Sequence, residues 1–423
     1  MNSKTLTNIF KGDKVVWMIF FFLCLISIVE VFSASSQLMY KGGNYLSPIM
    51  KHIGILFVGF VCMVMTLNVP CRYFKVLTPF LLLFAAVSLL WVLFAGESVN
   101  GSQRWVSIIG IQFQPSEIAK GALVLATAQI LSALQTTNGA DKNAFKYILF
   151  ISAPIVFFIF LENFSTAALL SSVILMMMII GRVPMNQIGK LLGIVALVAI
   201  IAFVGVMTLG HVKPEDPNKN LTEQVAQQQE EEDKGLFASA FHRADTWKAR
   251  IMKFTNSKPV PPDSVDLDKD AQVAHSNIAV ATSNIVGKGP GNSVERDFLS
   301  QAFSDFIYAI IIEEMGIEGA FFVALLYIIL LFRTGRIANR CENNFPALLA
   351  MGLALLLVTQ ALFNMCVAVG LAPVTGQPLP LISKGGTSTI INCVYLGAIL
   401  SVSRTAKKKP ESSEENSSAA MAI

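Results

Sequence analysis

Charge is scarce in this sequence. Asp, Glu, Lys and Arg make up 14% of the 423 residues, whereas about a quarter is usual in soluble domains. Hydrophobic residues make up 54%, and this balance excludes an ordinary soluble protein. The six cysteines show no CxxC spacing and lie in or beside apolar runs, so neither a disulfide framework nor a zinc site is indicated. The net charge of +4 is spread over different loops and does not indicate nucleic-acid binding.

Apolar runs long enough to cross a membrane recur along almost the whole chain. A hydrocarbon core about 30 Å thick needs about 20 residues of helix. We expect helices at 15–32, 49–67, 77–94, 118–134, 147–161, 165–180, 191–209, 306–332, 346–371 and 387–402. The sequence therefore predicts an all-α integral membrane protein with about ten transmembrane helices.

The distribution of Lys and Arg predicts the orientation of these helices. An even number of spans places both termini on one side, and the positive-inside rule makes that side the cytoplasm. The short outside loops hold only Lys41, Arg104 and Lys384, while the inside segments are much richer in basic residues. We expect a cytoplasmic N-terminus (1–14), seven helices (15–210), a large extracytoplasmic loop between helices seven and eight (211–305), three further helices (306–403) and a disordered cytoplasmic tail (404–423).

The large loop and the tail differ in composition from the rest of the chain. The loop contains two segments typical of exposed linkers, 227–233 (QQQEEED) and 258–263 (KPVPPD), so we expect part of it to be poorly ordered. In the tail, the lysines at 407–409 precede a Ser/Glu-rich segment, and we expect them to lie against anionic headgroups. The sequence has no convincing inverted repeat, which weakens the interpretation as an inverted-repeat transporter.

Three groups of polar residues interrupt the apolar pattern on the predicted outer face. The first is 100–105 (NGSQRW), followed by 114–120 (QPSEIAK). Pro115 favours a helix start, and Glu117 and Lys120 then lie on one helix face. We expect an ion pair just inside the outer boundary, which serves either the structure alone or substrate binding.

The second group, 304–316 (SDFIYAIIIEEMG), begins the eighth predicted helix. Ser304 or Asp305 could cap this helix, because a side-chain oxygen there meets free backbone amides. Glu313 and Glu314 lie two turns deeper. Carboxylates at that depth need a partner or a water-filled cavity.

The third group is the last predicted external loop, 373–388 (PVTGQPLPLISKGGTS). Its prolines and glycines predict a non-helical backbone, which is tolerated at membrane depth only where it lines a cavity or packs on protein. Lys384 and the two glycines after it could bring a cation and free amides to an anionic group. The alternatives without a binding role are that this segment is only a turn and that Lys384 reaches the lipid headgroups.

These three groups, in this order, resemble the SEDS family (shape, elongation, division and sporulation), and the resemblance spans 15–404. The family motifs N-G-x-x-R-W with Q-P-S-E-x-x-K, [ST]-D-F-I-[FY]-A leading to E-E-x-G, and P-V-T-G-x-P-L-P-x-x-S-x-G-G-[ST]-S stand at 100–105, 114–120, 304–316 and 373–388. The sequence departs from the family twice. Residues 162–166 (ENFST) stand where P-D-x-G-T is usual, and Lys384 stands where an aromatic residue is usual.

The resemblance implies a peptidoglycan glycosyltransferase that polymerises lipid II, an undecaprenyl-diphosphate disaccharide-pentapeptide, on the outer face of the bacterial cytoplasmic membrane. It implies Asp305 as the general base that activates the acceptor sugar hydroxyl. Arg104, Lys120 or a divalent cation (Mg²⁺ or Mn²⁺) of unknown ligands would stabilise the departing diphosphate. The other candidate substrate-binding residues are Gln114, Glu117, Glu313, Glu314, Ser383 and Lys384.

The resemblance also implies partners, namely a class B penicillin-binding protein and other divisome proteins. We expect an FtsW-like role at the division septum because of 243–254 (RADTWKARIMKF) and the extended external loop, with a RodA-like role in elongation as the alternative. A lipid II flippase or other transporter is a second alternative, but its cavity would also need polar residues in the cytoplasmic half. A scaffold without chemistry is the third.

Overall fold

The computed structural model describes residues 10–34, 46–95, 97–99, 102–108, 111–137, 139–209, 271–299 and 302–406. The chain divides into two units, one of Met1–Pro184 with Leu267–Ile423 and one of Met185–Asp266. The predicted linkers at 227–233 and 258–263, the segment 243–254 and the lysines at 407–409 lie outside the described residues. The first unit holds all the candidate site residues.

Each of the ten predicted runs forms a helix. Their bounds are α2 (Lys14–Ala34), α3 (Leu46–Asn68), α4 (Cys71–Ala95), α5 (Pro115–Ala133), α6 (Lys142–Glu162), α7 (Phe164–Ile180), α8 (Met185–Leu209), α12 (Ile307–Ala338), α13 (Asn344–Ala368) and α14 (Thr387–Thr405). Helix α8 belongs to the second unit and the other nine to the first. The described part of the large loop adds helix α11 (Ala271–Ala281) and the 3₁₀ helix η3 (Glu295–Asp297).

The helices differ in how well they suit a membrane span. Six of the described helices are long and apolar enough to cross a membrane, namely α2, α3, α4, α6, α12 and α13, while α7 and part of α8 are shorter apolar helices. Helices α5 and α14 are less apolar because they carry buried polar side chains such as Glu117, Lys120 and Asn392. This is an all-α integral membrane protein in which the less apolar helices face the interior.

The start of α2 and the ends of α12 and α14 meet at one end of the first unit. The backbone N–H of Asp13 donates a hydrogen bond to Ser403 Oγ at 3.0 Å. The carboxylate of Asp13 also forms an ion pair with Arg333, with 2.8 Å between Arg333 Nη2 and Asp13 Oδ2. These contacts agree with the prediction that the first and last helices have their terminal ends on one side.

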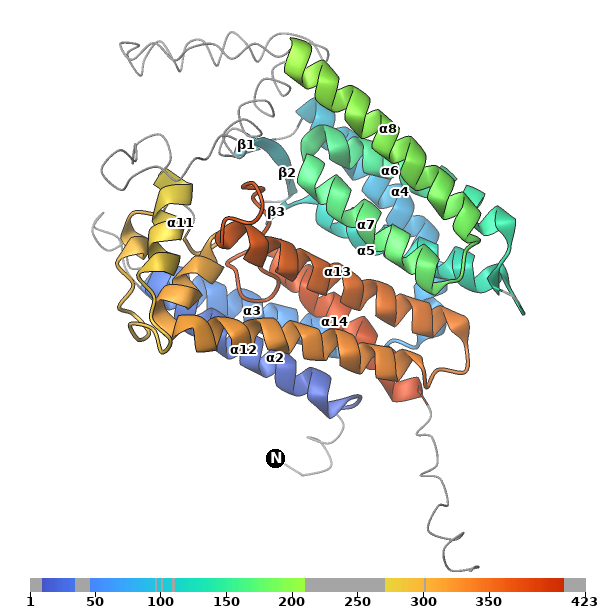
Figure 1. Cartoon of the computed structure of the whole chain (residues 1–423). Coiled ribbons are helices and arrows are strands. Elements are labelled where there is room, and N and C mark those ends of the chain that lie inside the picture. Colours follow the sequence, from blue (N-terminus) through green and yellow to red (C-terminus); the bar gives the residue numbers. More distant parts are fainter. Residues whose placement is uncertain are drawn as a thin grey trace, which may run out of the picture. The chain divides into compact units, whose positions relative to one another are not determined.

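Helix α13 is the central helix of the first unit. It packs against α5, α7, α12 and α14, and Figure 1 shows it between α5 and α7 on one side and α12 and α14 on the other. Of its apolar window 72% is buried, compared with 22% for α3. Polar side chains on α13 are therefore forced to find partners inside the protein.

Two small antiparallel sheets join the helices, where the sequence had predicted only loops. Strands β1 (Glu97–Val99), β2 (Ser102–Ile108) and β3 (Ile111–Phe113) form a meander that leads into α5, with Val106 opposite Phe113. Strands β4 (Gln135–Thr136) and β5 (Gly139–Ala140) pair between α5 and α6. The meander fixes where the chain enters α5.

Candidate functional site

Asp305 lies in a turn directly before α12. An apolar cluster anchors this turn from both ends, and its buried members are Ala34, Leu299, Ala302, Phe306, Ile310 and Val367. The N-cap position of α12 is Phe306, and no side chain caps the helix there. The capping role that the sequence suggested for Ser304 or Asp305 is therefore wrong. Instead, Ser304 Oγ donates to Asp305 Oδ1 at 3.0 Å, and Asp305 is only partly buried.

The 373–386 loop packs directly on this turn. The backbone N–H of Lys384 donates to the Phe303 carbonyl at 2.9 Å, and the Ser383 hydroxyl donates to the Ser304 carbonyl at 2.6 Å. The structure thus brings Asp305, Ser383 and Lys384 together from two segments that are 79 residues apart. These three are the core of the candidate site.

The predicted ion pair between Glu117 and Lys120 is confirmed. The Lys120 ammonium lies 2.8 Å from Glu117 Oε1 and 2.8 Å from Gln360 Oε1, and Lys120 is 0% exposed. Gln360 in turn donates through Nε2 to the Pro378 carbonyl at 3.0 Å. The lysine therefore contacts the 373–386 loop through Gln360. Its complete burial favours the structural alternative that the sequence left open, and binding of the diphosphate by Lys120 remains a prediction.

A second set of buried amides and hydroxyls holds the same loop. Asn364 Nδ2 donates to the Gln377 carbonyl at 2.7 Å and to the Asp305 carbonyl at 2.8 Å. The Gln377 side chain donates to Thr166 Oγ1 on α7 at 2.7 Å. Helices α7 and α13 thus fix the backbone of the 373–386 loop beside Asp305.

Sequence reasoning missed Gln360, Asn364, Gln377 and Thr166. Gln360 and Asn364 stand four residues apart in the apolar run 346–371. That spacing places both side chains on one face of a helix. Two amides in a membrane span are costly unless they find partners, so they were a usable signal.

Glu313 and Glu314 are completely buried, and the partner they need is the segment 288–296. Glu313 accepts hydrogen bonds from Lys288 Nζ at 2.6 Å, from the Ser293 hydroxyl and from the backbone amides of Val294 and Glu295. Glu314 accepts from the amides of Gly291 and Ser293 and from the Ser33 hydroxyl, with Arg296 Nη1 at 3.7 Å. These contacts hold the segment before Asp305 onto α12. The predicted substrate-binding role of the two glutamates is not tested by them.

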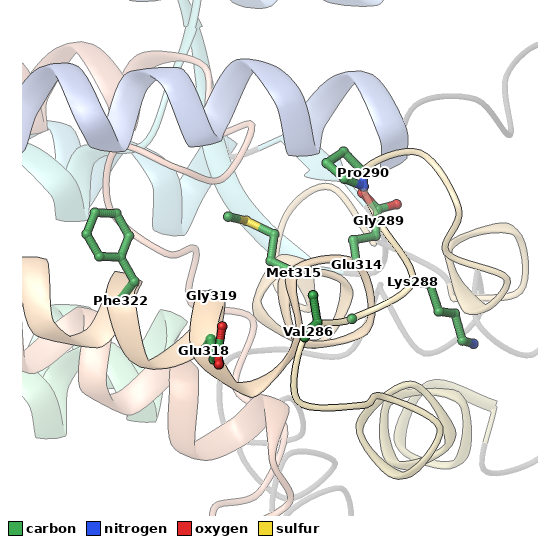
Figure 2. Close-up of a pocket in the computed structure, with 10 residues that line it drawn as sticks. Val286, Lys288, Gly289, Pro290, Glu314, Met315, Glu318, Gly319 and Phe322 are labelled. Atoms are coloured by element: carbon green, nitrogen blue, oxygen red, sulfur yellow. The ribbon is translucent and has the colours of Figure 1, made fainter.

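Helix α12 is broken at Gly316, where the same segment approaches it. Gly316 has φ 70° and ψ −173°, and a Cβ atom there would collide with the Ile285 carbonyl and the Gly287 nitrogen. The freed carbonyl of Glu314 accepts from the Gly289 amide at 2.8 Å. Figure 2 shows Gly289 and its neighbours beside Glu314 along an open groove on α12. The lining of this groove includes no residue of the Asp305 turn or the 373–386 loop, so it is separate from the candidate base.

Lys384 is half-buried over the ring of Phe303, with Nζ 4.8 Å from the ring centroid. This is a cation–π arrangement. Partial burial lowers the pKa of Lys384, and the positive charge of Lys51 lowers it further. Within the described part of the chain, no carboxylate forms an ion pair with Lys384. Its ammonium therefore lies over Phe303, two residues before Asp305 in the chain, and the described residues supply no carboxylate to neutralise it.

Arg104 and Gln114 lie in the segment that leads into α5. Arg104 stands in β2, and its side chain lies outside the described residues. Gln114 occupies the position before Pro115 and makes no capping hydrogen bond to α5. The contacts predicted for these two residues therefore remain untested.

The departure at 162–166 has a structural role in this chain. Asn163 alone separates α6 from α7, and its Oδ1 accepts hydrogen bonds from the backbone N–H groups of Ser165 and Thr166. Asn is among the preferred N-cap residues because a short side chain can reach these amides. The cap orients Thr166 toward Gln377, while Glu162 is buried at the end of α6.

Curated relatives cover nearly the whole chain. Peptidoglycan glycosyltransferase MrdB of Escherichia coli strain K12 is 26% identical over 95% of this chain and 96% of its own length. A probable peptidoglycan glycosyltransferase FtsW of Halomonas elongata is 29% identical over 90% of this chain and 87% of its own. Relatives of both names are thus similar to this chain.

Solved structures share the fold. One similar chain comes from a structure that describes structural coordination of polymerization and crosslinking by a peptidoglycan synthase complex. It superposes with a TM-score of 0.68, at 21% identity, over 94% of this chain and 99% of that one. The rod shape determining protein RodA of Thermus thermophilus gives a TM-score of 0.60 at 20% identity, over 94% of this chain and 98% of its own. The FtsW/RodA/SpoVE family model, described as Cell cycle protein, matches residues 13–408. The chain therefore belongs to the FtsW/RodA/SpoVE family, as its resemblance to the SEDS family implied.

Proposed function

We propose that this protein is a peptidoglycan glycosyltransferase that polymerises lipid II on the outer face of the cytoplasmic membrane. The observation that carries the proposal is the position of Asp305. Its carboxylate lies at a loop–helix junction, does not cap α12 and is backed by the 373–386 loop. The names of the relatives support the same reaction class.

In the proposed reaction Asp305 acts as the general base. Its carboxylate accepts the proton of the acceptor GlcNAc 4-hydroxyl while that oxygen attacks the anomeric carbon of the donor. The bond from this carbon to the undecaprenyl diphosphate breaks, and its electron pair leaves with the diphosphate. One displacement converts the α-linked donor into a β-linked polymer with inversion, so no covalent enzyme intermediate is required.

Negative charge that develops on the leaving diphosphate needs nearby cations. Lys384 suits this role because its ammonium lies over the ring of Phe303, which belongs to the same turn as Asp305. Within the described residues, no ion pair neutralises this ammonium. Arg104 is the second candidate. We assign Lys120 a structural contribution. It pairs with Glu117 and donates a hydrogen bond to Gln360, and Gln360 holds the Pro378 carbonyl of the loop.

A divalent cation is proposed as a further source of positive charge. The described residues contain no group of three or more His, Cys, Asp or Glu side chains suited to hold a metal ion. Mg²⁺ is commonly held by one or two carboxylates together with substrate phosphates. The residues present fit such an ion only if the diphosphate supplies most of its ligands.

Removal of divalent cations should therefore lower polymerisation without unfolding the protein. With excess EDTA, we expect the initial rate of lipid II consumption to fall, and Mg²⁺ or Mn²⁺ should restore it. The temperature of thermal unfolding in the same detergent should stay unchanged, because the ion is expected to bind only together with the substrate diphosphate. Full activity in EDTA would contradict the proposal of a divalent cation.

Replacing Lys384 with tyrosine should lower activity, although tyrosine is closer to the family pattern. We expect roughly a tenfold loss of turnover, because a charge-assisted contact to the diphosphate is lost. Raised divalent cation should relieve part of the loss. The matched control is Lys75→Tyr, since Lys75 also lies over a phenylalanine ring, that of Phe345, at 4.9 Å. Unchanged activity in Lys384→Tyr at every metal concentration would return Lys384 to the headgroup-facing surface.

One assay separates the proposed enzyme from the alternatives. Purified protein is incubated with lipid II in detergent and in vesicles, and both polymer and transbilayer movement are measured. Polymer that disappears in Asp305→Ala supports the enzyme. Movement of lipid II without polymer would indicate a flippase, and neither activity, with a class B penicillin-binding protein added, would indicate a scaffold.

The proposed partner is a class B penicillin-binding protein with one transmembrane helix. A likeness in fold to a chain of a peptidoglycan synthase complex supports a partner of this kind. We further propose an FtsW-like role at the septum together with other divisome proteins, with a RodA-like role in elongation as the alternative. Depletion should produce filaments in the first case and rounded cells in the second.

A further inference from the structure

Three consecutive backbone carbonyls in the turn that carries Asp305 are each held by a separate donor. The Phe303 carbonyl accepts from the Lys384 amide at 2.9 Å, the Ser304 carbonyl from the Ser383 hydroxyl at 2.6 Å, and the Asp305 carbonyl from Asn364 Nδ2 at 2.8 Å. Carbonyls before a helix do not need side-chain donors from distant segments, since water can satisfy them in an open turn. Their direct capture fixes the main chain of the turn.

Ser383 and Asn364 use every side-chain donor hydrogen that they have for hydrogen bonds within the protein. Ser383 is 2% exposed, and its oxygen also accepts from the Leu379 amide at 2.7 Å, which directs the hydroxyl hydrogen to Ser304. Asn364 is 1% exposed, and its amide group donates once to Asp305 and once to Gln377. Neither residue has a hydrogen left to donate to a substrate.

We propose that Asn364 and Ser383 are positioning residues. They hold the main chain of Asp305 in the position and rotation that its carboxylate needs to accept the proton. The inference rests on the proposed function and deepens it. It replaces the substrate contact that the sequence assigned to Ser383 with a contact to the main chain beside the base.

The reason is geometric. A general base must lie within about 2.6–3.2 Å of the atom whose proton it accepts. The apolar cluster around Phe306 fixes where the turn lies, but apolar contacts tolerate sliding. The hydrogen bonds to carbonyls 304 and 305 are directional and therefore set the rotation of the Asp305 main chain. A misplacement of about 1 Å is enough to cost about a hundredfold in rate.

The test uses Asn364→Leu and Ser383→Ala in the full-length protein. Leucine branches at the same carbon as asparagine and is bulkier, and it lacks both donor hydrogens, whereas alanine removes only the hydroxyl. Two control variants make the same changes elsewhere. Ser401→Ala removes a buried hydroxyl that donates to the Val69 carbonyl at 2.6 Å, and Asn344→Leu lies at the exposed start of the same helix α13.

Initial rates at varied lipid II concentration give kcat and KM, and binding of lipid II at saturation counts the folded sites. We expect kcat to fall about ten- to hundredfold in both variants, with KM and the number of binding sites within about twofold of the original protein. Ser383→Thr, which keeps the hydroxyl, should recover most of the rate lost in Ser383→Ala. Both control variants should retain their activity.

Three results would overturn the inference. A normal kcat in either variant would remove that residue from the positioning of Asp305. A raised KM with normal kcat would assign it to substrate binding, and Asn364 Oδ1, which has no hydrogen-bond partner within the described residues, would be the contact. A parallel loss of binding sites and kcat would make the residue structural only. Polymer formation by the original protein in the same assay tests the proposed function separately.

Discussion

Asp305→Asn is expected to abolish measurable glycan polymerisation while leaving the protein folded and inserted. The asparagine side chain matches the aspartate in shape but accepts no proton, and loss of a general base costs about 10²–10⁴-fold in rate. Asp305→Ala should behave in the same way. Because the side chain does not cap α12, neither change removes an N-terminal cap from that helix.

The measurement is polymer length and yield from lipid II, alongside thermal unfolding in detergent. Asp297→Asn is the matched control, since Asp297 lies in η3 of the same external segment and is likewise partly buried. It should keep its activity. Near-normal turnover in Asp305→Asn would exclude Asp305 as the base.

Lys120→Met is expected to produce the largest loss of stability among single substitutions in the site. It leaves the Glu117 carboxylate buried beside an apolar side chain, and breaking a buried ion pair in this way costs about 3–5 kcal/mol. It also frees Gln360 Oε1, which accepts from Lys120. Unfolding of the purified protein by heat or denaturant measures the effect.

A double substitution separates the two roles considered for Lys120. In Glu117→Met/Lys120→Met both charges are gone, and replacement of a buried pair by apolar groups is often neutral. We expect stability and lipid II binding to recover together, because Lys120 is inaccessible. Recovered stability with weak lipid II binding would instead support the diphosphate contact that the sequence assigned to Lys120.

The helices could be predicted from the sequence because the membrane imposes a length and an apolar composition on each of them. The β1–β3 meander could not, since strands as short as Glu97–Val99 and Ile111–Phe113 carry too little alternation to be recognised. The break in α12 was also missed. It depends on the close approach of Gly287 to Gly316, two residues 29 positions apart, whose partnership no local pattern reveals.

The candidate site was predictable where its residues carry charge in or beside an apolar span. The pairing of Glu117 with Lys120 followed from helical spacing, and the need of Glu313 and Glu314 for a partner followed from the cost of burial. The identity of that partner did not follow. Most of its donors are backbone amides of 291–295, and every residue type except proline offers the same amide.

The attachment of the 373–386 loop to α13 has a consequence for substrate affinity. Gln360 and Asn364 hold the consecutive carbonyls of Pro378 and Gln377 from adjacent turns of one helix. The loop has no regular secondary structure, yet the conformational entropy of these residues is lost when the chain folds. It is not lost a second time when substrate binds, and a preorganised site retains that free energy as affinity. The irregular backbone beside Asp305 is therefore as preorganised for ligand binding as a helix would be.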